Sequence, residues 1–333
     1  MLFERESNRM IIVGASSLLG AEVKSLLEEG RFAASDFRLL DEDLAAGILT
    51  ASGDEAVLIQ PVQEGSFARA RFVFFTGSAA FTMANVVAAQ QSGATLIDLS
   101  GALAGKGATT WFPSLEAQSG RQFSRDSFVY AIPSAAATAA CSLALALRSA
   151  MPQFLSILVL QSVSEAGRAG VEELENQTSQ LLSMQTAGKP IFDAQVAFNT
   201  LDRFGAASSH RISSWRLRIQ TEVHAALADA LSLPAIQVVH VPVFYGTTFS
   251  ACAVFDAAMD ADRVSQLCKV SGFTVTSGDL GPSNLSAAGE GMLQMAPPAS
   301  DAARPGTWWF WGAADNVRLP AANAVKLADL LAG

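Results

Sequence analysis

A glycine-rich turn near the start of the chain, Gly14-Ala-Ser-Ser-Leu-Leu-Gly20, has residue types suited to binding phosphate. It follows the apolar run Met10–Val13 and precedes apolar residues at helical spacing. Glycine lets the backbone approach a pyrophosphate, and a helix N-terminus offers free N–H groups and a positive dipole end. The pattern predicts a dinucleotide site, with a tight turn that binds no nucleotide as the alternative. Its candidate residues are Gly14, Ser16, Ser17, Leu18, Leu19 and Gly20.

Two features of this motif bear on the cofactor. Ser17 replaces the middle glycine, and its side chain leaves less room for a nucleotide to approach the backbone of the loop. The chain has therefore either retained or lost dinucleotide binding, and both alternatives stay open. Asp41, in the segment Asp41-Glu-Asp43, lies about twenty residues beyond Gly20, where a carboxylate can bind a ribose 2′-hydroxyl. NAD or NADP is therefore possible, and the acidic group favours NAD because it would repel a 2′-phosphate. A solvated acidic turn is the alternative interpretation.

Other reactive side chains are sparse. The segment Gln161–Gly170 is typical of a strand, a glycine-rich turn and a helix start, and by itself indicates only turn geometry. The three histidines, His210, His224 and His240, are far apart in the sequence, and Cys141 falls on an apolar helix where a buried thiol is expected. No nucleophile is paired with a base, and no metal-ligand spacing occurs.

The elements that must position these residues alternate between strand and helix. Strands are expected at Met10–Val13, Phe37–Leu40, Val57–Ile59, Phe72–Phe75 and Thr95–Leu99, with helices at Gly20–Leu27 and Ala79–Gln91. Short apolar strands separated by helices indicate a doubly wound, Rossmann-like parallel sheet, because parallel strands need long crossovers.

The pattern changes near Pro133, where a second, α+β domain is expected. Helices are expected at Ala135–Ser149 and Gly170–Met184, and strands at Ser156–Ser164, Gln237–Val243 and Ser250–Phe255, the last two in one sheet. The segment Ser277–Pro298, rich in Gly, Pro and Ser, is expected to be irregular, and Pro320–Leu331 is an amphipathic helix.

Composition limits the classes of partner. The net charge of -9 and the absence of a basic run argue against nucleic acid, and no apolar stretch is long enough to span a bilayer. The N-terminal sequence MLFERESNRM does not indicate a signal peptide, so a cytoplasmic protein is expected. The high apolar content, 50%, leaves room for a further surface buried in an oligomer.

Taken together, the motifs resemble those of the aspartate-semialdehyde dehydrogenase family, over nearly the whole chain. The segments that carry the resemblance are Gly14–Gly20, Ile97–Ala102, Gln161–Leu174, Ala197–Asn199, Val241–Phe244 and the helix around Asn323. The resemblance implies a nucleotide domain over residues 1–133 completed by 315–333, and a dimerisation and catalytic domain over 134–314. It also implies a homodimer and a cofactor contact at Asn323.

Enzymes of this family reduce an acyl phosphate with NADPH through a cysteine thioester, with a histidine as acid and base. In this chain the cysteine position is occupied by Ala135 and the histidine position by Thr247, neither of which can serve. His240 and Ala104 stand where the family has arginines for carboxylate and phosphate. Cys141 lies six residues beyond Ala135, about 9 Å along a helix, too far to substitute. The remaining candidate pocket residues are Gln161, Ser164, Arg218 in place of a lysine, Glu222 and His240.

Three hypotheses remain open from the sequence. The first is a catalytically silent homologue with a binding, regulatory or structural role. The second is an active NAD(P)-dependent oxidoreductase that acts on an aldehyde or oxo group by other chemistry, around Gln161, Ser164, His240 and Thr247. The third is a subunit or modulator that assembles with an authentic enzyme of the family.

Overall fold

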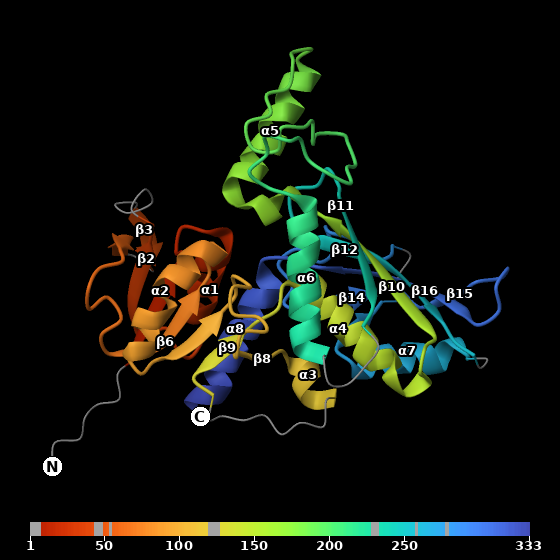
Figure 1. Ribbon diagram of the computed structural model, residues 1–333, viewed down its shortest axis with the longest axis horizontal. Coiled ribbons are helices and arrows are strands. Elements are labelled where there is room, and N and C mark those ends of the chain that lie inside the picture. Colours follow the sequence, from red (N-terminus) through yellow and green to blue (C-terminus); the bar gives the residue numbers. More distant parts are fainter. Residues whose placement is uncertain are drawn as a thin grey trace. The chain divides into compact units, whose positions relative to one another are not determined.

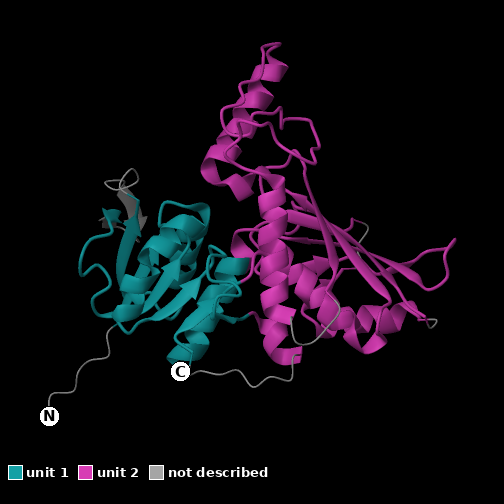
Figure 2. Ribbon diagram, viewed as in Figure 1, with its two compact units in different colours: residues 1–111, 123–132, 320–333 teal, residues 112–122, 133–319 magenta. Residues whose placement is uncertain are grey.

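The computed structural model describes residues 8–42, 49–52, 55–118, 127–227, 233–256, 259–276 and 280–333. Two compact units are formed (Figure 2): Met1–Trp111 with Phe123–Ile132 and Pro320–Gly333, and Phe112–Gln122 with Pro133–Leu319. Residues 112–122 and 315–319 therefore group with the second unit. The division expected from the sequence, 1–133 with 315–333 against 134–314, placed these two segments in the first domain. That division stays a prediction of where the domain boundaries lie. Asp43, Ser277 and the first seven residues, which entered the expectations above, lie outside the described residues.

The first unit is built on a seven-stranded parallel sheet in the order β5-β2-β1-β6-β7-β9-β8. Its central strand shows why the sheet is buried on both sides: Met10 and Ile12 face one apolar cluster, and Ile11 and Val13 face another. This confirms the doubly wound parallel sheet. The strands are β1 (Arg9–Val13), β2 (Asp36–Asp41), β5 (Gln60–Pro61), β6 (Ala70–Phe75), β7 (Thr95–Asp98), β8 (Thr109–Thr110) and β9 (Val129–Ala131).

Three helices cover this sheet (Figure 1), and they divide between its two faces. Helix α2 (Ala79–Gln91) packs Val86 and Ala89 into one apolar cluster. Helices α1 (Leu18–Glu29) and α8 (Arg318–Ala332) share the other cluster, where Leu27 and Leu327 are both fully buried. The C-terminal helix thus completes the first unit.

One expected strand does not join this sheet. Strand β4 (Glu55–Leu58), which overlaps the expected strand Val57–Ile59, pairs with β3 (Leu49–Ser52) in a separate antiparallel hairpin. The parallel sheet instead takes the two-residue strand β5, because Gln60 pairs with Leu40 and Pro61 with Asp41. The expected strand thus exists in part, but its place in the parallel sheet was predicted wrongly, since a short apolar run does not reveal its pairing partner.

The second unit contains a seven-stranded mixed sheet in the order β11-β10-β12-β16-β14-β13, with β15 paired to β16. Strands β11 and β12 do lie in one sheet, as expected, but β10 separates them: it runs parallel to β11 and antiparallel to β12. The strands are β10 (Phe154–Gln161), β11 (Ala235–His240), β12 (Thr247–Val254), β13 (Phe273–Val275), β14 (Leu293–Met295), β15 (Ala299–Ser300) and β16 (Thr307–Ala314).

The helices of this unit centre on α4 (Ala135–Leu147), every residue of which is buried. Its alanines allow close approach of the neighbouring helices and of β12. Helix α6 was not predicted, because its apolar residues are interrupted by charged ones. Strand β14 lies within the segment Ser277–Pro298, which is therefore not irregular throughout. The remaining helices are α3 (Pro113–Gln118), α5 (Gly167–Leu182), α6 (Ile212–Leu227), α7 (Ala261–Val270) and the 3-10 turns η1 (Arg148–Ala150) and η2 (Val163–Ala166).

The two faces of the mixed sheet differ in burial. Residues on β10, β11 and β12 alternate between buried and partly or fully exposed positions, so one face packs on the helices and the other points outward. The outward face presents large apolar side chains, among them Phe154, Leu158, Trp309 and Trp311. Within the described part of the chain no helix is long and apolar enough to cross a membrane.

Candidate functional site

The N-terminal end of helix α4 is where the family resemblance places the cysteine of the related enzymes, a position that Ala135 occupies in this chain. Ser134 is the N-cap of this helix, and its hydroxyl accepts a hydrogen bond from the N–H of Ala137 at 3.4 Å. Ala135 follows as the first helical residue, and its methyl group is almost completely buried. The helix therefore begins with a hydroxyl that serves as a cap and a side chain that carries no functional group.

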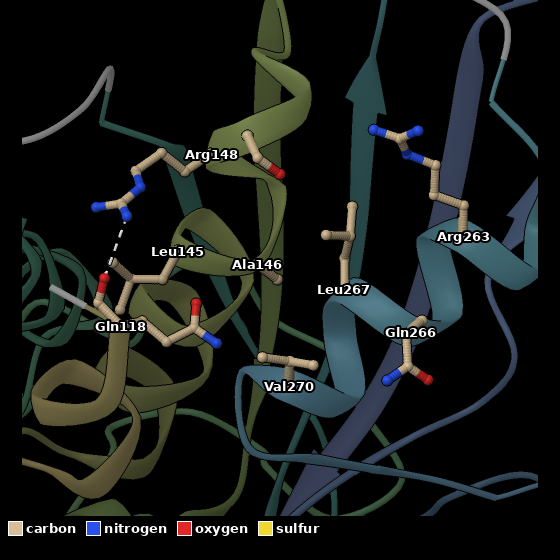
Figure 3. A pocket seen from close by; sticks show the side chains of 9 residues that line it. Gln118, Leu145, Ala146, Arg148, Arg263, Gln266, Leu267 and Val270 are labelled. Carbon is tan, nitrogen blue, oxygen red and sulfur yellow. Dashed lines mark hydrogen bonds between the residues drawn. The ribbon is translucent and has the colours of Figure 1, made fainter. Parts of the chain in front are cut away.

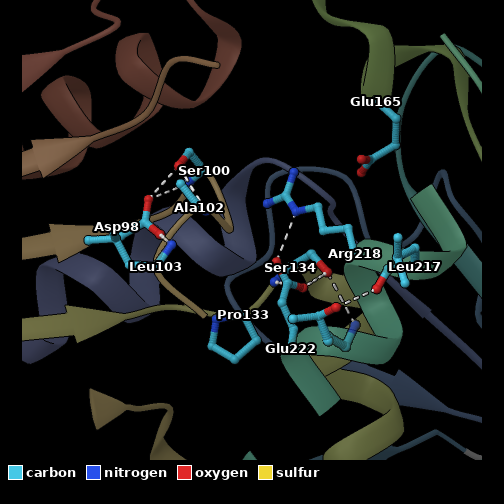
Figure 4. A network of polar contacts seen from close by, with 12 residues as sticks. Asp98, Ser100, Ala102, Leu103, Pro133, Ser134, Glu165, Leu217, Arg218 and Glu222 are labelled. Carbon is cyan, nitrogen blue, oxygen red and sulfur yellow. Dashed lines mark hydrogen bonds and ion pairs between the residues drawn. The ribbon is translucent and has the colours of Figure 1, made fainter. Parts of the chain in front are cut away.

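A buried carboxylate closes this helix start (Figure 4). Glu222, on α6, accepts the backbone N–H of Ser134 at 2.9 Å and its hydroxyl at 2.5 Å, both through Oε2. Its other oxygen, Oε1, accepts from Nε of Arg218 at 2.8 Å, one helical turn earlier. Glu222 is only 2% exposed, so a cation and a helix N-terminus together compensate its charge.

The two buried cysteines of this unit, Cys141 and Cys268, are poor nucleophiles. Cys141 lies in the apolar core of the second unit, and burial, with a smaller effect of the Glu222 carboxylate, raises the pKa of its thiol. Burial also raises the pKa of Cys268 to about 12. Both thiols therefore stay protonated at neutral pH, and a protonated thiol is a poor nucleophile.

A second group of polar side chains gathers at the ends of β10 and β12. The antiparallel register places Gln161 opposite Thr247, whose hydroxyl donates to Gln161 Oε1 at 2.9 Å. Asn316 donates from Nδ2 to the hydroxyl of Ser164 at 2.9 Å, and its Oδ1 accepts from the N–H of Gly246 at 2.7 Å. All these side chains are buried, so their orientations are fixed by hydrogen bonds.

Glu165 belongs to the same group and links it to the pair on α6. Nδ2 of Asn316 lies 3.5 Å from its Oε1. Burial raises the pKa of the half-buried Glu165 carboxyl, while the Arg218 cation and hydrogen bonds from the Asn316 and Gln161 amides oppose the rise. Glu165, Gln161, Ser164, Arg218, Glu222 and Asn316 thus form one connected polar site within the second unit.

His240, which the sequence analysis assigned to this pocket, has aromatic neighbours. Its ring lies 5.7 Å from that of Phe204 and 6.2 Å from that of Phe192, between centroids. The side chain is fully buried, and burial is the main cause of its lowered pKa. The imidazole is therefore neutral near pH 7 and provides no cation for a carboxylate.

The glycine-rich loop of the first unit forms the predicted strand-turn-helix. Gly14 has φ of +89°, and a Cβ there would lie 2.2 Å from the backbone nitrogen of Gly77. Ser17 is the N-cap of α1: its Oγ accepts the N–H of Gly20 at 2.9 Å and donates to the carbonyl of Thr76 at 3.0 Å. The N–H groups of Leu18 and Leu19, in the first turn, are those that a helix leaves for a ligand.

Two further predicted cofactor residues also belong to the first unit. The Asp41 carboxylate is buried and accepts backbone N–H groups from Ser16 at 2.7 Å and from Glu42 at 2.8 Å. It therefore ties the end of β2 to the glycine loop. Asn323, on α8, is 5% exposed, and its Nδ2 has no hydrogen-bond partner among the described residues. A buried amide donor without an acceptor fits a ligand that would supply one.

The segment that follows β7 is held together by hydrogen bonds to the carboxylate of Asp98. Asp98 is fully buried and accepts from the N–H and hydroxyl of Ser100 and from the N–H of Leu103 (Figure 4). Ala104, at the position of the family's phosphate-binding arginine, is buried as well. This loop is therefore folded around its own carboxylate and presents no cation at residue 104.

A separate surface pocket of about 320 Å³ lies beside the C-terminal end of α4 and helix α7. Its lining includes Arg148, whose guanidinium donates to the carbonyl of Gln118, and Arg263 (Figure 3). None of the polar site residues lines it. Among the residues that the structure describes, no group of three His, Cys, Asp or Glu side chains could hold a metal ion.

Comparison with known proteins gives the family. Residues 9–140 match the NAD-binding domain of semialdehyde dehydrogenases, and residues 144–319 match their dimerisation domain. A USG-1 protein homolog from Pseudomonas aeruginosa is 30% identical over 325 residues, with 96% of each chain covered. The chain belongs to the aspartate-semialdehyde dehydrogenase family.

Solved structures agree with this membership of the aspartate-semialdehyde dehydrogenase family. A probable aspartate-semialdehyde dehydrogenase from Pseudomonas aeruginosa has a TM-score of 0.87 and 28% identity, covering 97% of this chain and 98% of its own. Aspartate-semialdehyde dehydrogenase II from Vibrio cholerae has a TM-score of 0.85 at 24% identity, covering 97% of this chain and 98% of its own, and shows the same fold.

Two residues of the polar site, Glu165 and Asn316, and the cap of α4, Ser134, were not predicted from the sequence of this family member. Ser134 was not named, although a serine before an apolar helix is an N-cap signal. Glu165 was treated as part of a turn, and a charged residue amid Ser, Ala and Gly could have marked it. Asn316 carries no local signal, because its partners Ser164 and Gly246 are distant in sequence.

Proposed function

We propose that this protein is a ligand-binding homologue of aspartate-semialdehyde dehydrogenase that does not carry out the thioester chemistry of the family. The observation that supports this most strongly is the start of α4, where a methyl group, Ala135, follows a serine cap tied to Glu222. A thioester needs a thiolate, and Cys141 is locked in the core as a thiol.

The missing proton acceptor supports the same conclusion. The Thr247 hydroxyl donates a hydrogen bond to Gln161, and a threonine hydroxyl neither ionises nor becomes protonated near neutral pH, so it cannot act as the acid and base. His240 is held among aromatic rings. Loss of a nucleophile together with its base removes most of the rate acceleration of a covalent mechanism.

A nicotinamide dinucleotide is the proposed ligand of the first unit. The turn at Gly14, the first-turn amides of Leu18 and Leu19, and the Asn323 amide, which has no hydrogen-bond partner among the described residues, fit a cofactor with phosphate and carboxamide groups. We favour NAD over NADP because Asp41 would repel a 2′-phosphate. When bound, the group would supply a hydride acceptor or donor. The residues named here would only hold and orient it.

We further propose a homodimer formed through the outward face of the mixed sheet. A sheet face that meets water normally carries charged side chains, and the outward positions of β10, β11, β12 and the middle of β16 carry none. These positions are Phe154, Ser156, Leu158, Leu160, Ala235, Gln237, Val239, Thr248, Ser250, Cys252, Val254, Trp309 and Trp311. Light scattering should report a dimer, and Leu158→Glu combined with Trp311→Glu should yield monomers.

An activity assay tests the loss of family chemistry. The protein is incubated with aspartate semialdehyde, phosphate and either NAD or NADP, alongside the aspartate-semialdehyde dehydrogenase from Vibrio cholerae as a positive control. We expect no reduced cofactor above background from this protein. Turnover would instead favour an oxidoreductase with other chemistry. Increased activity of the control enzyme on mixing would favour a modulator that assembles with it.

A further inference from the structure

The surface pocket beside the C-terminal end of α4 has apolar walls. Leu145 and Ala146 contribute to it from α4, and Leu267 and Val270 contribute from α7. Leu145 and Ala146 are buried, whereas Val270 is 63% exposed. An apolar group that enters the pocket therefore covers part of the Val270 side chain, and removal of this surface from water favours binding.

The polar part of the pocket lining is positively charged. Arg148, in η1, and Arg263, in the first turn of α7, line the pocket together with the neutral side chains of Gln118, Ser149 and Gln266. The lining, which consists of described residues, contains no aspartate or glutamate, although the chain as a whole has a net charge of -9. The pocket therefore attracts an anion rather than a cation.

Both guanidinium groups keep hydrogen-bond donors for a ligand. Arg148 donates to the carbonyl of Gln118 at 3.2 Å, which fixes its side chain on one side of the pocket (Figure 3). Arg263 projects from α7 on the other side. Among the residues that the structure describes, neither arginine is paired with a carboxylate. Because a guanidinium carries five N–H donors, each arginine can make charge-assisted hydrogen bonds to an anionic ligand.

The volume of the pocket limits the size of the ligand. About 320 Å³ corresponds to roughly ten water-sized groups at ~30 Å³ each. A single anionic group therefore fits together with a chain of about eight carbon atoms, which is the size of octanoate. Such a ligand matches both parts of the lining, because its charge meets the arginines and its chain meets the apolar walls.

We propose that this pocket binds a monoanion with an apolar chain, of the class of medium-chain carboxylates. Arg148 and Arg263 attract the anionic group. The chain lies against Leu145, Leu267 and Val270. The inference goes beyond the proposed function, because no residue of the polar site or of the glycine loop lines the pocket.

Calorimetric titration with octanoate tests the proposal, with 1-octanol and acetate as partial analogues. Octanoate should bind saturably. 1-Octanol has the chain without the charge and should bind at least about threefold more weakly, as expected from the loss of an exposed ion pair. Acetate has the charge without the chain and should bind at least about tenfold more weakly, because it buries little apolar surface.

Three variants that each lower the net charge by one locate the site. Val270→Asp places a carboxylate in the pocket wall and should weaken octanoate binding at least about tenfold. Arg263→Gln should weaken it at least about threefold. Lys269→Gln changes an exposed residue of α7 that does not line the pocket, so it is the matched control and should bind octanoate like the unchanged protein. Circular dichroism shows whether the variants are folded.

Several outcomes would overturn the proposal. These are the absence of saturable octanoate binding, equal affinities for octanoate and 1-octanol, and unchanged octanoate affinity in folded Val270→Asp and Arg263→Gln. A loss of affinity in Lys269→Gln as large as that in Arg263→Gln would also overturn it, since binding would then follow the net charge alone. These titrations involve no nucleotide and no turnover, so their outcome is independent of the activity assay.

Discussion

Helices α1 and α4 both begin with a serine cap at the end of a strand of the parallel sheet, yet the two helix starts differ in what they leave for a ligand. The hydroxyl of Ser17 donates to a neutral carbonyl, that of Thr76. The hydroxyl of Ser134 donates to the carboxylate of Glu222, which also takes the N–H of Ser134. The first helix start keeps the features of an anion site, whereas the second already holds an anion of the protein. The start of α1 thus keeps a glycine turn and a helix N-terminus, whereas the start of α4 carries no reactive side chain.

Gly14 is the position at which the backbone least tolerates a side chain, so its replacement should lower the free energy of unfolding most. Gly14→Ala places a Cβ 2.2 Å from Gly77 and forces alanine to φ of +89°. We expect a loss of about 4 kcal/mol in the free energy of unfolding. Gly65→Ala is the control, because Gly65 also has positive φ but no atom within 4 Å of its would-be Cβ. It should lose only about 1 kcal/mol in denaturant titration. Equal losses would show that the close approach to Gly77 costs little.

Replacement of Glu222, the carboxylate at the start of α4, should have the second-largest effect on stability. Glu222→Ala removes both the acceptor of the Ser134 N–H and hydroxyl and the carboxylate that pairs with Arg218. We expect a loss of about 3 kcal/mol in the free energy of unfolding, measured by urea titration. Glu172→Ala, at an exposed position, should change it by less than about 0.5 kcal/mol. A small loss for Glu222→Ala would mean that water replaces the carboxylate readily.

How far the sequence predicts these two regions depends on how local their interactions are. The glycine loop could be predicted, because Gly14, Ser17 and Gly20 act within one strand-turn-helix segment. Helix α2 was predicted with the bounds it has in the structure, Ala79–Gln91, since its apolar content is continuous. The glycine loop and helix α2 are both determined by residues that are close together in the sequence.

The polar site was only partly predictable, because its contacts are long-range. Ser134 and Glu222 are 88 residues apart, and Ser164 and Asn316 are 152 apart. Helix α6, which carries Arg218 and Glu222, was not predicted, although both side chains were named from the family resemblance. His240 was assigned to the pocket by the same resemblance, and the pairing of β10 with β11 brings its ring among aromatic side chains instead.

A smaller effect should appear in the pH dependence of stability. Because the pKa of Glu165 is raised in the folded state, the folded protein binds this proton more tightly than the unfolded chain. The free energy of unfolding therefore falls as the pH rises from the ordinary glutamate pKa, 4.5, through the raised value. Glu165→Gln cannot ionise, so its stability relative to the unchanged protein should increase over that window and then level off. Parallel pH profiles from pH 4 to 8 would contradict the assigned burial.

The smallest change in stability is expected at the cap of α1. Ser17→Gly restores the middle glycine and loses the cap hydroxyl, which should cost a few tenths of a kcal/mol, whereas Ser17→Ala should cost about 1 kcal/mol. If the Ser17 side chain narrows the approach to the loop, Ser17→Gly should bind NAD more tightly in calorimetry and Ser17→Ala should not. Equal affinities for all three proteins would show that Ser17 does not obstruct the nucleotide.

The start of α4 can be tested most directly by intact-protein mass spectrometry. The protein is incubated with aspartate semialdehyde and NAD or NADP without phosphate, so that an acyl group transferred to the protein would accumulate. Because Ala135 provides no nucleophile and Ser134 is held by Glu222, we expect the mass to remain that of the unmodified chain. An acyl adduct that maps to Ser134, Cys141 or any other residue would contradict the account.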